Sequence, residues 1–266
     1  MREHPTAPKK SLGQHWLNDQ QTLKSIVDYA EINKQDYVLE IGPGLGSLTE
    51  FISQKAGRVL AVEIDRDLFN MLKIKKHQDN LEFVNEDILK FDFTKLPKNY
   101  KIVANIPYYL TSHLIRLLSE SINPPIKIVL LIQKEVAERI AADPGSMSTL
   151  SVVVQQYFQV QKKDIVPAEM FTPPPKVDSQ IIVLSRRPKP AIQTSDDREL
   201  FRLVRIGFSA RRKTLENSLS NGLRQDKQSI RKLIAEAELQ ASIRPQMLSL
   251  EDWAKLFKVF EAHNLI

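Results

Sequence analysis

Short apolar runs alternate with amphipathic segments between residues 37 and 184. Residues 37–41, 59–64, 81–85, 102–105 and 126–132 are rich in Val, Ile and Leu and are expected to be strands. Residues 48–54, 67–75, 111–119 and 134–142, which lie between those runs, are expected to be helices. Nearly continuous apolar strands suit a parallel sheet that is buried on both faces. The pattern therefore predicts an α/β fold with a Rossmann-like, doubly wound sheet, completed by strands at 158–166 and 179–184.

The hydrophobic pattern changes after a charged segment with two prolines at 185–190, which is expected to be a linker. Beyond it, Leu200, Leu203, Val204 and Phe208 share one helical face, and Arg198, Arg202 and Arg205 share the opposite face. Two further apolar stripes are Ile230, Leu233, Ile234 and Ala237, and Trp253, Leu256, Phe257 and Phe260, the latter after a capping-box spacing at Ser249 and Asp252. We expect an α/β domain over 1–185 and a small all-helical domain over 191–266.

Composition narrows the classes of function. None of the 266 residues is cysteine, which excludes disulfides, thiolate metal sites and cysteine nucleophiles. The five histidines have no metal-ligand spacing, so no metal site is expected. The longest apolar run, 126–132, is far shorter than the roughly 20 residues of a membrane helix, and the first ten residues contain no apolar signal segment. We expect a cytoplasmic protein without membrane contact.

Positive charge is concentrated in the segment 186–232. It holds 13 Lys and Arg against five Asp and Glu, whereas the rest of the chain has a net charge of −2 and the whole chain +6. A near-neutral body with a basic appendage suggests a polyanionic partner, with nucleic acid favoured over a membrane. Arg205, Arg211, Arg212 and Lys213 are candidate phosphate contacts, and salt would weaken such binding steeply. The alternative is that these side chains only solvate a helical surface.

A glycine-rich segment follows the first expected strand. Gly42, Gly44 and Gly46 let the backbone turn sharply and approach a ligand closely. Their G-x-G-x-G spacing differs from the G-x-G-x-x-G of dinucleotide sites and suits a nucleoside without a pyrophosphate. Glu63, at the end of the second strand, can accept hydrogen bonds from both ribose hydroxyls, and Asp87, after the third strand, can bind an adenine amine. The plainer explanations are a tight turn for the glycines, a solvated strand end for Glu63 and a helix cap for Asp87. Together, the three features favour a nucleoside cofactor.

The fourth expected strand ends in Asn105-Ile-Pro-Tyr108, the most specific motif in the chain. An exocyclic amine such as N6 of adenine is a poor nucleophile, because its lone pair is delocalised into the ring. An enzyme that alkylates this amine needs acceptors for both N–H groups, and the Asn105 side chain with the backbone carbonyl of Ile106 or Pro107 supplies them. Pro107 fixes φ and removes a competing donor, and Tyr108 can stack on a flipped base. The alternative is an ordinary turn at a strand end.

Nearly the whole chain resembles the ribosomal RNA adenine N6,N6-dimethyltransferases, and within them the bacterial small-subunit enzymes. The resemblance is carried by KKSLGQHWLND at 9–19, EIGPGLG at 40–46, VEID at 62–65, NIPY at 105–108, QKEVAER at 133–139, FTPPPKVDS at 171–179, FSARRK at 208–213, and RP at 244–245 with LSLE at 248–251. It implies a class I methyltransferase sheet and two successive methyl transfers to each of two adjacent adenosines. Those adenosines would lie in a hairpin loop near the 3′ end of 16S ribosomal RNA, modified late in assembly of the small (30S) subunit.

The same resemblance implies which residues act. S-adenosylmethionine, the methyl donor, would contact His15, Leu17, Gly42, Glu63, Asp87 and Asn105, with Gly44 in the same loop as Gly42. The target adenine would lie between Tyr108 and Phe171, and the helical domain would help to hold the RNA or the ribosomal particle. We expect a monomer, because RNA of ribosomal size offers a single asymmetric site.

Three positions depart from the family pattern. His15-Trp16 stand where the family usually has Asn-Phe, a change that a backbone contact from residue 15 would survive. Asn-Leu-Pro-Tyr is common in the small-subunit enzymes, whereas Asn-Ile-Pro-Tyr also occurs in the erythromycin-resistance methyltransferases of the large subunit. The segment 145–150 is shorter than its family counterpart and lacks a tyrosine.

Three alternatives stay open. A resistance methyltransferase would use the same pocket on large-subunit RNA, although the FTPPPKVD and LSLE segments favour the small-subunit enzyme. A non-catalytic RNA-binding or assembly factor would not require Glu63, Asp87, Asn105 and Tyr108 to be retained. A nicotinamide dehydrogenase is disfavoured by the glycine spacing, and S-adenosylmethionine rather than NAD should raise the thermal stability.

Overall fold

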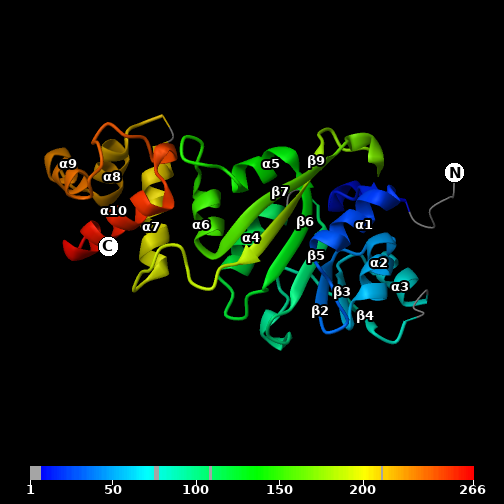
Figure 1. Cartoon of the computed structure of the whole chain (residues 1–266). Coiled ribbons are helices and arrows are strands. Elements are labelled where there is room, and N and C mark those ends of the chain that lie inside the picture. Colours follow the sequence, from blue (N-terminus) through cyan, green and yellow to red (C-terminus); the bar gives the residue numbers. More distant parts are fainter. Residues whose placement is uncertain (1–6, 75–77, 108–109, 211) are drawn as a thin grey trace. The chain divides into compact units, whose positions relative to one another are not determined.

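The computed structural model describes residues 7–74, 78–107, 110–210 and 212–266. The chain forms two compact units (Figure 1). The first runs to Ala137 and resumes over Val160–Arg186, and the second takes Glu138–Gln159 and Arg187–Ile266. This division differs from the expected contiguous boundary at 185, because α6 (Thr149–Tyr157) packs on α7 and α10, two helices of the second unit.

Seven strands of the described residues form the main sheet, which confirms the predicted α/β class. They are β2 (Tyr37–Ile41), β3 (Arg58–Glu63), β4 (Leu81–Asn85), β5 (Lys101–Asn105), β6 (Lys127–Gln133), β7 (Phe158–Val166) and β9 (Ser179–Arg186). Their order is β4-β3-β2-β5-β6-β9-β7. The β4-β3-β2-β5-β6 pairs are parallel and β6–β9 is antiparallel. The strand order reverses between β2 and β5, where open α/β sheets bind their ligands.

Helices between the strands cover the sheet. They are α1 (Gln20–Tyr29), α2 (Ser47–Lys55), α3 (Arg66–Ile74), α4 (Thr111–Ser119) and α5 (Lys134–Ile140), and those expected from the sequence lie within two residues of their expected bounds. Figure 1 shows the blue and cyan helices α1, α2 and α3 gathered together beside the strands. Ile26 of α1 and Ile52 of α2 are fully buried in one core with Val38 and Val129 of the sheet. Apolar residues at helical spacing thus meet the continuous apolar strands.

A second, very small sheet was not predicted. Strand β1 (Trp16–Leu17) pairs antiparallel with β8 (Phe171–Thr172), so that Leu17 lies opposite Phe171. Two-residue strands leave no periodicity in the sequence, and their partners are far apart along the chain. This pairing brings the segment before α1 next to the Pro-rich loop after β7.

The second unit is helical, as predicted. Besides α6 it contains α7 (Asp197–Gly207), α8 (Leu215–Leu223), α9 (Lys227–Glu236) and α10 (Leu250–Ala262). The predicted apolar stripes are buried, apart from the half-buried Phe208, and Arg198, Arg202 and Arg205 are exposed. The predicted capping box of Ser249 and Asp252 begins α10.

Single 3-10 turns in the two units occur at Lys10–Leu12, Phe93–Lys95, Ala168–Met170, Phe208–Ala210 and Pro245–Met247. No helix in the described part of the chain is long and apolar enough to span a membrane.

Candidate functional site

A pocket lies at the carboxyl ends of β2, β3, β4 and β5, in the first unit. Its lining includes the predicted His15, Leu17, Gly42, Gly44, Glu63, Asp87, Asn105, Pro107 and Phe171. The parallel register explains why residues so distant in sequence meet. Glu40 lies opposite Val103, and Glu63 lies opposite Asn85, so the loops that follow these strands leave the sheet at one edge.

The glycine segment forms the floor between β2 and α2. Gly42, Gly44 and Gly46 have φ values of 67°, 59° and 87°, in the left-handed region that favours glycine. A Cβ atom on Gly46 would come within 2.8 Å of the Leu72 side chain, whereas one on Gly42 would meet nothing within 4 Å. The predicted sharp turn is therefore present, and the backbone at Gly42 is open to a ligand.

Glu63 is a buried carboxylate, not a solvated strand end. Its Oε2 accepts the Gly44 N–H at 3.1 Å, and its Oε1 accepts the Asp65 N–H at 2.8 Å. The Asn85 amide holds the main chain from the other side by donating to the carbonyl oxygens of Glu63 and Ile64. Burial raises the pKa of Glu63, although the two N–H donors oppose the shift. Each oxygen retains acceptor capacity, because a carboxylate has about four lone-pair sites.

Asp87 caps a turn and also lines the pocket. One carboxylate oxygen accepts the Leu89 N–H at 3.0 Å, which caps the turn after β4. The residue is nevertheless half-buried and lines the pocket. A turn of this kind fixes the side chain, so the carboxylate is held at the pocket wall.

Glu40 is a pocket residue that the sequence interpretation missed as a candidate. It is 1% exposed, and neither carboxylate oxygen has a hydrogen-bond partner among the described residues. Burial raises its pKa to about 8, further than the nearby Thr49 hydroxyl lowers it, and the Glu63 carboxylate adds to the increase. An unpaired buried carboxylate is costly unless a donor or a cation meets it. The missed signal was an acidic residue inside an otherwise apolar strand.

Asn105 ends β5 with its amide in a defined direction. The Nδ2 group donates to the backbone oxygen of His15 at 3.3 Å, so Oδ1 of the same amide points away from His15. The carbonyl of Pro107 accepts the Leu110 N–H at 3.0 Å and closes a turn into α4. Tyr108, the predicted stacking residue, lies outside the described residues.

The segment before α1 forms another wall. Nδ1 of His15 donates to the Pro173 carbonyl at 2.7 Å, and its backbone holds Asn105. Leu17 and Phe171 are buried opposite each other in the β1–β8 pair and both line the pocket. His15 thus connects the N-terminal segment, β5 and the Pro-rich loop.

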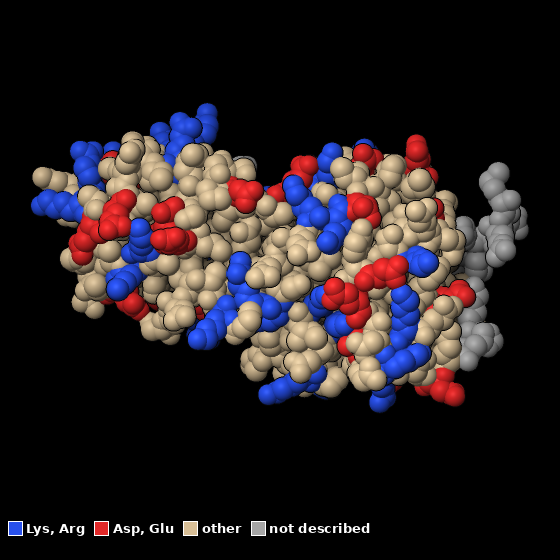
Figure 2. Space-filling model, in the orientation of Figure 1, with Lys and Arg blue, Asp and Glu red and all other residues tan. Residues whose placement is uncertain are grey.

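The candidate phosphate contacts lie in the helical unit, outside this pocket. Arg205, Arg212 and Lys213 are exposed, while Arg211 lies outside the described residues. Figure 2 shows Lys and Arg side chains along the upper edge of this unit, and others beside acidic side chains lower on the same face. The pocket therefore lies in the first unit, and these candidate phosphate contacts lie in the second. The described residues contain no group of three or more His, Asp or Glu placed to hold a metal ion.

The largely parallel sheet with its antiparallel strand β9, the glycine loop and the acidic strand end are those of a class I methyltransferase. The chain belongs to the ribosomal RNA adenine dimethylase family, whose family model matches residues 6–261.

Relatives and solved structures agree with this family. The chain is 40% identical to ribosomal RNA small subunit methyltransferase A of Streptococcus pneumoniae, over all of this chain and 96% of that protein. Its Enterococcus faecalis counterpart is 39% identical over 99% and 94% of the two chains. A dimethyladenosine transferase from Plasmodium falciparum superposes with a TM-score of 0.82 at 30% identity, covering 93% of this chain and 98% of that one. The 23S rRNA methyltransferase ErmE gives 0.76 at 28% identity, covering 92% and 99%.

Proposed function

We propose that this methyltransferase dimethylates the N6 amines of two adjacent adenosines in the 3′-terminal hairpin loop of 16S ribosomal RNA. S-adenosylmethionine is the donor, and the modification belongs to small-subunit biogenesis in the cytoplasm, carried out by a monomer. One observation carries the chemistry: Asn105 lines the pocket with its amide nitrogen held by His15, so the amide oxygen is left to accept from an amine.

The pocket residues fit S-adenosylmethionine. Glu63 supplies a carboxylate for the ribose hydroxyls, and Asp87 supplies one for the adenine amine. Glu40, buried without a hydrogen-bond partner among the described residues, is proposed to lose its proton when the donor binds and to face the ammonium group of the amino-acid part. Gly42 leaves its backbone open, and His15, Leu17 and Gly44 complete the walls that surround the molecule. When bound, this donor supplies a methyl group activated by its sulfonium.

The protein's own residues position the amine. The Asn105 oxygen accepts one N–H, and the carbonyl of Ile106 or Pro107 takes the other; the Pro107 carbonyl accepts the Leu110 N–H and retains a second lone pair. Holding both N–H groups draws the nitrogen lone pair out of conjugation and toward the methyl group. No general base is required before transfer, since the nitrogen becomes acidic as it is alkylated. Good positioning alone contributes roughly 7–11 kcal/mol to such a reaction.

The target base has to leave its stack to enter this pocket. Phe171 offers an aromatic ring at the pocket wall, and Tyr108 is proposed to stack on the opposite face of the base. Arg205, Arg211, Arg212 and Lys213 are proposed to contact phosphates at a distance from the reacting base.

A large-subunit target is the second candidate, supported by the similarity to ErmE. The small subunit is favoured, because relatives named for it are 40% identical over the whole chain.

A methyl-transfer assay tests the proposal. Labelled S-adenosylmethionine is incubated with small-subunit particles from cells that lack the modification, with large-subunit particles and with an Asn105→Ala variant. Dimethyladenosine in 16S RNA alone, absent with the variant, is expected. Label in large-subunit RNA would transfer the protein to the second candidate function. No transfer to either RNA, with donor binding intact, would refute the enzymatic proposal on these substrates.

A further inference from the structure

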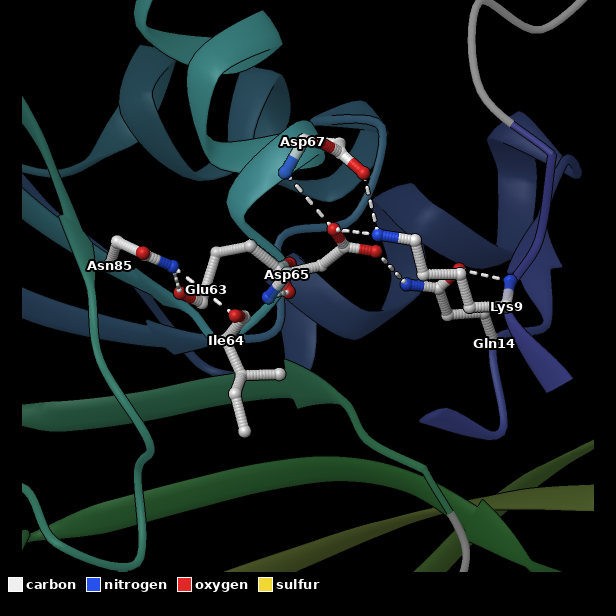
Figure 3. Close-up of polar contacts among 7 residues, drawn as sticks. All are labelled: Lys9, Gln14, Glu63, Ile64, Asp65, Asp67 and Asn85. Atoms are coloured by element: carbon white, nitrogen blue, oxygen red, sulfur yellow. Dashed lines mark hydrogen bonds and ion pairs between the residues drawn. The ribbon is translucent and has the colours of Figure 1, made fainter. Parts of the chain in front are cut away.

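A cluster of charged and polar groups fastens the N-terminal segment to the turn after β3 (Figure 3). The Asp65 carboxylate accepts from Lys9 Nζ at 2.7 Å, from Gln14 Nε2 at 3.0 Å and from the Asp67 N–H at 3.0 Å. Lys9 Nζ also lies 2.7 Å from the Asp67 carboxylate. Two donors from the N-terminal segment and one from the turn itself thus converge on one carboxylate.

The two aspartates differ in exposure. The Asp65 side chain is 2% exposed, whereas the side chains of Lys9 and Asp67 are 42% and 66% exposed. Burial alone would raise the pKa of Asp65, but the hydrogen bonds from Lys9, Gln14 and the Asp67 N–H outweigh it and hold the pKa below its usual range. The bonds to Asp65 are therefore charge-assisted and end on a buried carboxylate, while the Lys9–Asp67 pair joins two exposed side chains and is screened by solvent.

The segment that Asp65 holds is a wall of the pocket. Residues 12–17 all line it. The Gln14 side chain also accepts the Lys9 N–H at 2.7 Å. This bond joins the two ends of the segment 9–14 and holds the side-chain donors of Lys9 and Gln14 near each other. On its other side, the Asp65 N–H donates to Glu63 Oε1. One residue therefore touches both the N-terminal wall and the carboxylate proposed for the ribose.

We propose that Asp65 is a positioning residue for the methyl donor: its carboxylate keeps the segment 9–17 closed against the pocket while its backbone N–H orients Glu63. This inference rests on the proposed function. The bound donor would be retained by the closed segment, so loss of the Asp65 carboxylate should speed its dissociation. Asn105, proposed to hold the amine, meets the far end of the segment, where its amide donates to the His15 carbonyl. Loss of Asp65 should therefore affect binding of the donor more than the transfer step.

The test compares variants in their affinity for S-adenosylhomocysteine, measured by calorimetry. Asp65→Asn retains the size of the side chain but has a single acceptor for three donors. It should weaken binding at least about tenfold, mainly through faster dissociation. Asp67→Asn removes only the charge of the exposed partner of Lys9 and should change affinity less than about threefold. Glu82→Gln is the matched control, because Glu82 pairs with Arg58 at the opposite end of β3.

Kinetics separate positioning from folding. Asp65→Asn should raise the KM for S-adenosylmethionine while kcat at saturation stays within about twofold, a split that a merely structural role would not produce. Gln14→Ala should reproduce the effect, and the double variant should be no worse than Asp65→Asn alone. Gln14→Ala also keeps the test possible if Asp65→Asn does not fold.

The outcomes distinguish the two proposals. If the wild-type protein does not bind S-adenosylhomocysteine, the proposed function fails. If it binds, and folded Asp65→Asn and Gln14→Ala bind as tightly as the Glu82→Gln control, the positioning role of Asp65 is overturned. A fall in kcat with unchanged KM would also overturn it.

Discussion

At the scale of single residues, two buried carboxylates share one pocket. Glu63 has backbone donors on both oxygens, whereas Glu40 has no hydrogen-bond partner among the described residues. The neighbouring charge of Glu63 adds to the burial that raises the pKa of Glu40 to about 8. Glu40 is therefore mainly protonated at neutral pH in the free protein. Its buried carboxyl group has no hydrogen-bond partner among the described residues.

The stability of Glu40→Gln relative to the wild type should increase as the pH rises. The folded pKa of about 8 exceeds the unfolded value of 4.5, so between these values the folded state binds a proton that the unfolded state has lost. Wild-type stability contributed by this group is fully present below pH 4.5 and is lost as pH rises toward 8, by up to about 1.4 kcal/mol per unit. Glutamine does not titrate. Urea unfolding at about pH 5, 6.5 and 8 should show a widening advantage for the variant.

Glu82→Gln serves as the control, since Glu82 is exposed and paired with Arg58. Parallel stability curves for the wild type and Glu40→Gln would contradict the prediction, because they would mean that Glu40 titrates alike in both states.

Asn105→Ala should lower kcat by about 100- to 1,000-fold, the usual effect of deleting one group that stabilises a transition state. The loss should exceed any change in S-adenosylhomocysteine affinity, since the amide oxygen is proposed to act on the amine. Asn105→Asp restores an acceptor but cannot donate to the His15 carbonyl, so it should recover activity only in part. Single-turnover methylation measures the step. Wild-type kcat in the alanine variant would exclude Asn105 from the chemistry.

At the scale of elements, substitutions in the turn from β2 into α2 separate the effect of backbone strain from that of side-chain packing. Gly42→Ala and Gly46→Ala both place a Cβ on a left-handed residue, which costs about 1–3 kcal/mol. Only Gly46→Ala also overlaps Leu72, so it should be the more destabilising change. Gly42→Ala projects into open space at the pocket and should instead weaken S-adenosylhomocysteine binding. Denaturant unfolding and calorimetry measure the two effects.

Gly145→Ala is the matched control for this pair. Gly145 has φ of 109°, a Cβ added to it would meet nothing within 4 Å, and it lies in the other unit. It should lose stability through strain alone and leave ligand affinity unchanged. Equal ligand affinity for Gly42→Ala and Gly145→Ala would show that the Gly42 backbone does not face the ligand.

At the scale of the whole molecule, the pocket proposed for the donor and the residues proposed to bind phosphates lie in different units. The triple variant Arg205→Gln, Arg212→Gln and Lys213→Gln removes three exposed charges. Each phosphate contact contributes about 0.7–0.9 to the slope of log affinity against log salt, so the slope should fall by about 2 to 3. Filter binding of a 16S hairpin RNA across salt concentrations measures it, and S-adenosylhomocysteine affinity should not change.

A second triple variant with the same loss of charge provides the control: Lys24→Gln, Lys34→Gln and Lys98→Gln, each in the first unit and outside the pocket lining. An equal drop in salt slope for both triples would indicate a response to net charge alone and would refute specific contacts by the helical unit.

Much of this architecture was predictable from the sequence, because it depends on local physics. A strand buried on both faces must be apolar throughout, so β2, β3, β4, β5 and β6 were found within two residues of their bounds. Parallel strands end at one edge, which is why Gly42, Glu63, Asp87 and Asn105 could be assigned to one pocket. The helical faces of the second unit followed from the spacing of their apolar residues.

Other contacts could not be read from any local pattern. The β1–β8 pair joins Leu17 to Phe171, the neighbouring Asn18–Thr172 bond spans 154 positions, and Asp65 meets Gln14 across 51 positions. These partners are brought together by the packing of the sheet. The same applies to Glu40, whose isolation is a property of its surroundings and not of its neighbours along the chain.

The order of residues was thus enough to establish which side chains reach the edge of the sheet, because apolar periodicity and strand direction are local properties. Only the folded structure shows which of those side chains form hydrogen bonds or ion pairs and which have no partner among the described residues. Burial and long-range hydrogen bonds exist only once the chain has folded, so the tether at Asp65 and the unpaired carboxylate of Glu40 are visible only in the tertiary structure.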